Sequence, residues 1–141
     1  MRIADVLRSK GSHVATVAPT ASVSDMIAEL AAHNVGALPV VDGEQLVGIV
    51  SERDVVRRLN ADGAALLEAS VGEIMTTEVT TCSPDDRVAD LAAVMTSRRV
   101  RHLPVVVDGR LAGIISIGDL VKARIDLLAS ERQQLQSYIA G

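Results

Sequence analysis

Two Gly-Ile-(Val/Ile) segments of the chain are each followed by a serine that stands three residues before an aspartate. The pairs are Ser51 with Asp54 and Ser116 with Asp119, each directly after a Gly-Ile-Val or Gly-Ile-Ile triplet. A strand that runs straight into a helix start leaves backbone N–H groups that attract an anion, and the helix dipole adds to this attraction. The serine hydroxyl could bond a phosphate oxygen, and the aspartate could accept two hydrogen bonds from a ribose diol. The pattern favours a nucleotide site, but Ser-x-x-Asp is also an ordinary helix-capping box.

The two motifs belong to an internal repeat. Residues 14–57 recur at residues 79–122 at a constant offset of 65 without a gap, and seventeen of the forty-four aligned positions are identical. Such self-similarity indicates two copies of one supersecondary unit. We expect the copies to pack about a pseudo-twofold axis, so that any pocket on that axis occurs in two versions with different side chains.

Each copy is predicted to run strand, helix, strand, strand, helix. In the first copy Ser22 is typical of a helix N-cap, and Asn34 is a good residue for the helix to stop at. The hairpin that follows is expected to turn at Asp42-Gly43. The predicted elements are a strand at 13–18, a helix from 22 that stops at 34–36, strands at 37–41 and 46–50, and a helix from 51.

The second copy repeats this order. Its predicted elements are a strand at 79–82, a helix core at 88–95, strands at 102–107 and 111–115 around Asp108-Gly109, and a helix from about 116. Upstream, residues 3–7 resemble residues 71–75, but at an offset of 68, so the first copy has three extra residues around 9–12. We divide the chain into a first domain at 1–60, a linker at 61–70, a second domain at 71–125 and a helical extension at 126–141.

The last helix is predicted to be longer than its counterpart. Apolar residues fall four and three positions apart along it, which is typical of a coiled-coil stripe, and Arg132 interrupts them. The stripe could pack on its own domain or contact another subunit. Its residues are Val121, Ile125, Leu128, Leu135 and Ile139.

Composition narrows the class of protein. The chain has 141 residues, 48% of them hydrophobic, with no Phe or Trp and a single Tyr, so its core must be aliphatic. A net charge of −4 and the lack of aromatic stacking platforms argue against a nucleic-acid partner. No apolar run approaches the ~20 residues of a membrane span, the start lacks a secretory signal, and Cys82 has no disulfide partner. We therefore expect a cytoplasmic protein with no membrane partner.

The order and spacing of these motifs resemble a known family. Two repeats, each with Leu-Pro-Val-Val, a short Asp-Gly hairpin, Gly-Ile-(Val/Ile)-Ser and then Asp, are similar to a tandem pair of cystathionine-beta-synthase (CBS) domains, a Bateman module. The resemblance implies an α/β (α+β) fold of two β-α-β-β-α repeats about a pseudo-twofold axis, with an extended C-terminal helix. It also implies a homodimer, and a cleft for an adenosyl ligand: AMP, ADP, ATP, S-adenosylmethionine or a dinucleotide such as NAD.

The resemblance also assigns roles to residues. Asp54 and Asp119 would hold ribose hydroxyls, and Ser51 and Ser116 would meet phosphates. Cys82 is expected to be a small buried side chain and not a reactive thiol. The segments expected to flank the base are Thr16, Val17 and Ala18 in the first copy and Thr81, Cys82 and Ser83 in the second.

The two copies differ in charge just before the Leu-Pro-Val segment. The first has Gly36-Ala37 before its Leu-Pro-Val, and the second has Arg101-His102. By resemblance, Arg101 and His102 would reach across to the site of Ser51 and Asp54, where Arg53 adds a third basic group. The site of Ser116 and Asp119 would face Gly36 and Ala37 and would bind weakly or take an uncharged adenosyl group. The alternatives are a solvated arginine cluster at a helix end and a structural histidine.

These features predict a regulatory module that senses an adenine nucleotide and signals by conformational or oligomeric change to a regulated protein of unknown identity. No nucleophile stands with a base and an orienting group, and His13 and His33 lack metal-ligand partners, so we assign no catalytic residue, no metal and no required cofactor. The alternatives are a protein-interaction adaptor with a vestigial cleft, a module that binds S-adenosylmethionine or NAD, and a nucleotide hydrolase, which would lack a glycine-rich phosphate loop.

Overall fold

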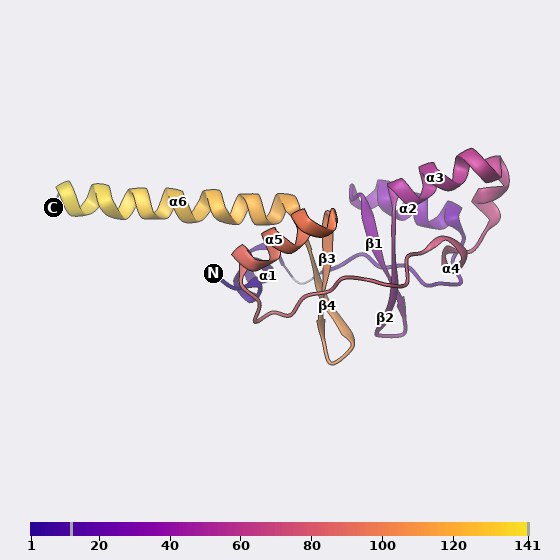
Figure 1. Cartoon of the computed structure of the whole chain (residues 1–141), viewed down its shortest axis with the longest axis horizontal. Helices are drawn as coiled ribbons and strands as arrows, with labels where there is room; N and C mark the ends of the chain where they lie inside the picture. The colour runs from indigo at the N-terminus through magenta and orange to yellow at the C-terminus, as the bar shows by residue number, and fades with distance from the viewer. Residues whose placement is uncertain (12, 141) are drawn as a thin grey trace.

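A computed structural model describes residues 1–11 and 13–140 of the chain. Its body is a mixed α/β structure from which one long helix projects (Figure 1). The α/β class and the extended C-terminal helix predicted from the sequence are confirmed. The elements in chain order are α1 (Ile3–Lys10), α2 (Val23–His33), β1 (Ala37–Asp42), β2 (Gln45–Ser51), α3 (Glu52–Asp62), the 3-10 helix η1 (Gly63–Glu68), α4 (Val71–Ile74), α5 (Val88–Arg98), β3 (His102–Val107), β4 (Arg110–Ser116) and α6 (Ile117–Ala140).

The helix α2 begins and ends where its sequence predicts. Ser22 has an extended backbone, and its Oγ accepts a hydrogen bond from the Asp25 N–H at 3.0 Å. Asn34 ends the helix in the left-handed conformation, with a φ of 52°. Val23 and Met26 lie on one face and are fully buried, because residues three apart stack on the same side of a helix.

The strand predicted at the start of each repeat is reduced to one residue. Val17 donates to the Pro39 carbonyl at 3.1 Å and accepts from the Val41 N–H at 3.0 Å, which is a single parallel bridge. A longer ladder would need an N–H from Pro39 on one side and from Pro19 on the other, and proline has none. Cys82 forms the same single bridge in the second repeat. The prolines that limit the pairing there are Pro84 and Pro104.

The four strands form one sheet in the order β1-β2-β4-β3, built from two antiparallel hairpins. The strands β2 and β4 pair at Gln45 and Arg110, next to the two turns. The opposite ends of these strands lead into α3 and α6. Strand pairing therefore joins the two repeats beside the hairpin turns. At the other ends of β2 and β4, where the Ser-x-x-Asp motifs lie, the helices position the two repeats.

The second hairpin turns at Asp108-Gly109 as predicted, with φ values of 53° and 79°, the conformation that a two-residue turn of this sequence favours. The first hairpin turns one residue later than predicted. Asp42 pairs with Gln45, so the turn residues are Gly43-Glu44. The reason is that Gly43 has a φ of 65°, which glycine adopts without strain.

Each repeat has its own core, but the N-terminal helix packs on the second one. From α1, Ile3 and Val6 lie in the core of the second repeat. From α4, Val71 and Ile74 lie in the core of the first repeat. The similarity between residues 3–7 and 71–75 thus reflects two equivalent helices, each covering one core.

The segment expected to be a linker at 61–70 is mostly helical. The helix α3 continues to Asp62, and η1 occupies Gly63–Glu68. Leu66 of η1 is 1% exposed and belongs to the first core. The connection therefore contributes apolar surface to the first repeat as well as joining it to the second.

Two glycines at equivalent positions of β2 and β4 are packed differently. A Cβ on Gly48 would lie 2.9 Å from the Thr76 carbonyl oxygen, whereas one on Gly113 would lie 2.6 Å from the side-chain end of Leu7. A side-chain end can rotate away, but a backbone oxygen cannot. We therefore expect Gly48→Ala to lower the free energy of unfolding by about 1–3 kcal/mol and Gly113→Ala by clearly less. Urea unfolding of both variants measures this, and equal losses would contradict it.

The helix α6 extends well beyond the body of the chain (Figure 1). Its predicted apolar stripe is largely exposed, with Ile125 at 59% and Leu135 at 63%. A subunit contact along this stripe stays a prediction. Among the described residues, no helix combines the length and the apolar character needed to cross a membrane.

Candidate functional site

A cleft of about 700 Å³ lies where the two repeats meet. It brings together the start of α3, the connection between α5 and β3, and the start of β3. Ser51, Arg53 and Asp54 of the first repeat line it with Arg101 and His102 of the second. The structure therefore places these five predicted site residues around one hollow. The other lining residues are Gly36, Ala37, Ile49, Glu52, Val56, Arg57, Thr76, Glu78, Val79, Thr80, Arg99 and Val100.

Ser51 and Asp54 form the capping box of α3. The Ser51 N–H donates to Asp54 Oδ2 at 2.8 Å, the Ser51 hydroxyl lies 3.1 Å from the same oxygen, and the Asp54 N–H lies 3.4 Å from Ser51 Oγ. The capping interpretation of the motif is thus correct. It does not exclude ligand binding, because the hydrogen bonds from the described residues go to Oδ2 and leave Oδ1 for a sugar hydroxyl.

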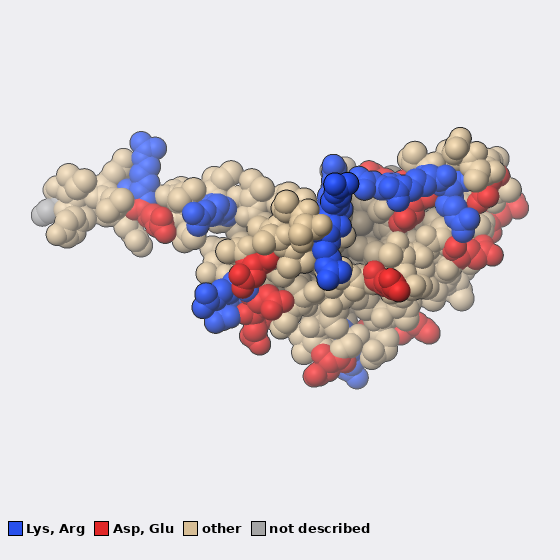
Figure 2. All heavy atoms as spheres, in the orientation of Figure 1, with Lys and Arg blue, Asp and Glu red and all other residues tan. Residues whose placement is uncertain are grey.

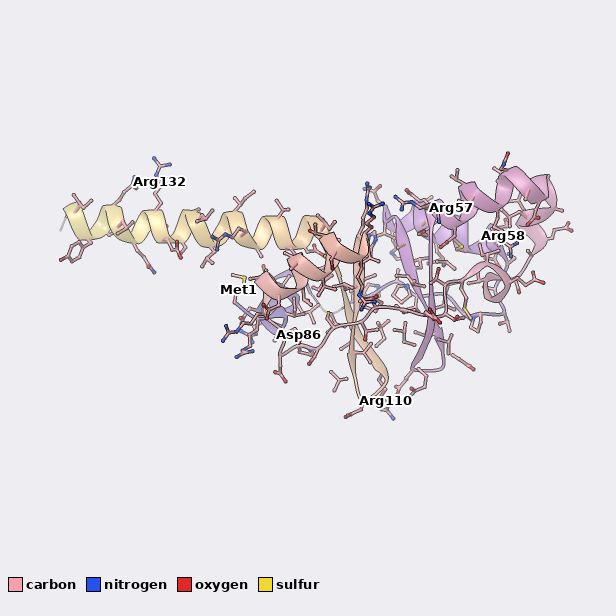
Figure 3. All side chains as sticks on the ribbon, viewed as in Figure 1. Met1, Arg57, Arg58, Asp86, Arg110 and Arg132 are labelled. Atoms are coloured by element: carbon pink, nitrogen blue, oxygen red, sulfur yellow. The ribbon has the colours of Figure 1, made fainter. Side chains whose placement is uncertain are left out.

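Arginines outnumber carboxylates around this cleft, although the whole chain has a net charge of −4. Figure 2 shows Lys and Arg side chains gathered where the two halves of the molecule meet. Arg57 lies on α3 near this junction (Figure 3), whereas the neighbouring Arg58 donates to the Glu73 carbonyl at 2.9 Å. The local excess of positive charge suits an anionic ligand. The charged lining residues are Arg53, Arg57, Arg99 and Arg101 against Glu52, Asp54 and Glu78.

The surroundings of His102 in the cleft lower its pKa. Burial is the largest cause and lowers the pKa of His102 from 6.5, and the positive charges of Lys10 and Arg101 lower it further. The carboxylates of Asp119 and Glu52 act in the opposite direction and are outweighed. His102 is therefore neutral at pH 7 and can gain a proton when an anion binds nearby.

The second motif has the same capping geometry but is also bound by a lysine. The Ser116 N–H donates to Asp119 Oδ2 at 2.9 Å, and Lys10 Nζ donates to the same oxygen at 2.6 Å. Burial alone would raise the pKa of Asp119, but the hydrogen bonds from Lys10 and Ser116 outweigh it and hold the pKa below its ordinary value. Gly36 and Ala37, which we expect opposite this motif, line the Asp54 cleft.

The residues expected to flank the base do not line the Asp54 cleft. Val17 and Cys82 are buried in their own cores, and burial raises the pKa of the Cys82 thiol to about 12, which makes it unreactive at neutral pH. Ala18 and Thr81 are exposed, Thr16 lines a separate hollow beside the turns, and the backbone N–H of Ser83 donates to Asp86 at 2.8 Å.

The segment that does reach the cleft comes just before the predicted one. Thr76, Glu78, Val79 and Thr80 line it. Sequence reasoning missed this because we read residues 79–82 as a regular strand. The bridge between Thr76 and Ile49 holds the segment against β2 instead.

Comparison with known proteins identifies the family. The CBS domain family matches residues 3–61 and 71–126, so the chain belongs to this family and contains two tandem CBS domains. The chain is 39% identical over 150 residues to the mitochondrial CBS domain-containing protein CBSX3 of Arabidopsis thaliana, covering 99% of this chain and 72% of that protein. A crystal structure of a CBS-domain containing protein from Agrobacterium tumefaciens has 44% identity and a TM-score of 0.84, covering 88% and 99% of the two chains.

Two further solved structures contain adenosyl ligands. CBSX2 in complex with AMP is 29% identical with a TM-score of 0.75, over 89% of this chain and 97% of that one. The CBS domain pair of protein MJ0100, in complex with 5′-methylthioadenosine and S-adenosyl-L-methionine, is 28% identical with a TM-score of 0.78, over 87% and 98%. Relatives of this chain thus bind ligands that share an adenosyl group.

Proposed function

We propose that this protein is a regulatory module that binds an adenine nucleotide in the cleft between its two CBS domains. The observation that carries the proposal is the shared cleft: Asp54 comes from the first repeat and Arg101 from the second. A ligand held by the aspartate at its ribose and by the arginine at its phosphate would bridge the two repeats.

The charge of the cleft favours a phosphorylated ligand. Four arginines against three carboxylates suit AMP, ADP or ATP better than the uncharged 5′-methylthioadenosine. The AMP complex of CBSX2 supports the same class. S-adenosylmethionine and NAD remain the alternatives that the experiment below includes.

Signalling would follow from a shift in populations. A bridging ligand changes the angle between the repeats only to the extent that it prefers one arrangement, so its effect depends on differential affinity. We propose that the output passes through a homodimer or a regulated protein, and that the module itself is not catalytic. The cytoplasmic location stays a prediction, and the Arabidopsis relative is named as mitochondrial.

Thermal unfolding with added ligand tests this function. We expect AMP to raise the midpoint progressively, because a ligand at a hundred times its Kd stabilises the folded state by about 2.7 kcal/mol. ATP, NAD and S-adenosylmethionine are compared at equal concentration, and product analysis after incubation with ATP tests the hydrolase alternative. If none of the four ligands shifts the midpoint, the adaptor with a vestigial cleft replaces the sensor.

AMP binding is expected to take up a proton at His102. A phosphate dianion beside this side chain would raise its lowered pKa, so affinity should increase as pH falls through the window between the raised and the lowered values. Calorimetry in buffers of different ionisation enthalpy measures the uptake. The AMP phosphate itself titrates near pH ~6, so His102→Gln provides the reference. Identical proton uptake by wild type and His102→Gln would contradict the prediction.

A further inference from the structure

Lys10 occupies the second Ser-x-x-Asp motif. Its Nζ donates to Asp119 Oδ2 at 2.6 Å and to the Ile114 carbonyl oxygen at 2.8 Å. The side chains are partly buried, with 34% of Lys10 and 23% of Asp119 exposed. An ammonium is thus held on Asp119 Oδ2, where it balances the charge of the carboxylate and lies beside Oδ1, the oxygen that a ligand hydroxyl would need.

The first repeat fills the equivalent positions differently. Ile49 aligns with Ile114, and its carbonyl accepts from the backbone N–H of Thr76 at 2.9 Å. Asp54 aligns with Asp119, and among the described residues no lysine or arginine forms an ion pair with it. In the second repeat the Lys10 ammonium therefore donates to the strand carbonyl. In the first repeat the backbone N–H of Thr76 donates to the equivalent carbonyl.

Helix length explains this difference. The helix α1 runs for 8 residues and ends at Lys10, whereas its counterpart α4 runs for 4 residues and ends at Ile74. The longer helix carries Lys10 to the turn between β4 and α6. The difference falls where the first copy has its three extra residues; of these positions, Ser12 lies outside the described residues.

We propose that Lys10 closes the second ligand position of the module. Its ammonium takes the place of ribose hydroxyls at Asp119, so that each chain accepts one adenosyl ligand, in the cleft of Ser51 and Asp54. The inference rests on the proposed function and adds the residue that sets the number of ligands. A ligand entering at Asp119 would have to displace the ammonium from two oxygen acceptors.

Isothermal titration calorimetry with AMP and with adenosine tests the role of Lys10. Lys10→Met keeps most of the length of the side chain and removes its charge. Lys122→Met is the matched control, because Lys122 lines the same hollow of about 400 Å³ beside Asp119. We expect one site per chain in the wild type and in Lys122→Met, and two in Lys10→Met, where the new site takes adenosine as well as AMP.

The outcomes separate the two proposals. One site in Lys10→Met, with unchanged affinity, overturns the role of Lys10 and leaves the proposed function intact. Two sites in the wild type also overturn that role, as does loss of the original site in a folded Lys10→Met. No binding by any of the three proteins overturns the proposed function and the role of Lys10 together. Lys10→Gln is prepared in parallel, so that a folding defect in one variant does not decide the result.

Discussion

Asp54→Ala is expected to weaken AMP binding by about 100-fold or more. A carboxylate that accepts two hydrogen bonds from a ribose diol contributes about 1.5–3 kcal/mol through each, and about 1.4 kcal/mol corresponds to a tenfold change in affinity. The variant should still fold, because loss of the capping box at Ser51 costs only about 1 kcal/mol of stability. Calorimetric titration with AMP, after the melting temperature has been recorded, gives the change in Kd.

Asp119→Ala is the matched control for Asp54→Ala. It removes the same capping aspartate from the other repeat, where Oδ2 is already bonded to Lys10. We expect its AMP affinity to stay within about twofold of the wild type, since substitutions away from the bound ligand change free energies by about 0.5 kcal/mol or less. A larger loss from Asp119→Ala than from Asp54→Ala would reverse the assignment of the occupied site.

Arg101→Ala is expected to weaken AMP binding by about tenfold or more and to leave adenosine binding nearly unchanged. The reason is that a guanidinium contributes a charge-assisted hydrogen bond of about 1.5–3 kcal/mol to a phosphate and nothing to an uncharged nucleoside. Titrations with both ligands at one fixed ionic strength measure the difference, because salt screens exposed charges.

Arg98→Ala controls for the general effect of removing a positive charge near Arg101. Arg98 ends α5 but does not line the cleft, whereas Arg99 and Arg101 do. If Arg98→Ala weakened AMP binding as much as Arg101→Ala, the three arginines would act only as a solvated cluster at a helix end.

Much of the fold follows from short-range sequence signals. The constant offset of 65 predicts two equivalent units, and caps such as Ser22 and Asn34 predict the helix ends correctly because their side chains and backbone satisfy local hydrogen bonds. The reduced first strands were also predictable, since Pro39 has no N–H to extend the parallel pairing beyond Val17. The prediction of a strand at 13–18 does not take this missing donor into account.

The sequence does not predict in the same way which core each of two similar helices covers. Residues 3–7 and 71–75 are similar amphipathic segments, and each could cover either core, so the pattern does not determine that Ile3 packs in the second one. The three extra residues near Lys10 were visible as a change of offset. The position of the Lys10 ammonium depends on how far α1 continues. A change of offset in the sequence does not reveal where that helix ends.

A crystal structure of the protein grown with AMP would show directly whether one ligand bridges the two repeats. We predict one AMP per chain, between the repeats, with its ribose hydroxyls on Asp54 and its phosphate within hydrogen-bond distance of Arg101. An AMP bound at Asp119 with Lys10 displaced, or on a surface that touches one repeat alone, would contradict it.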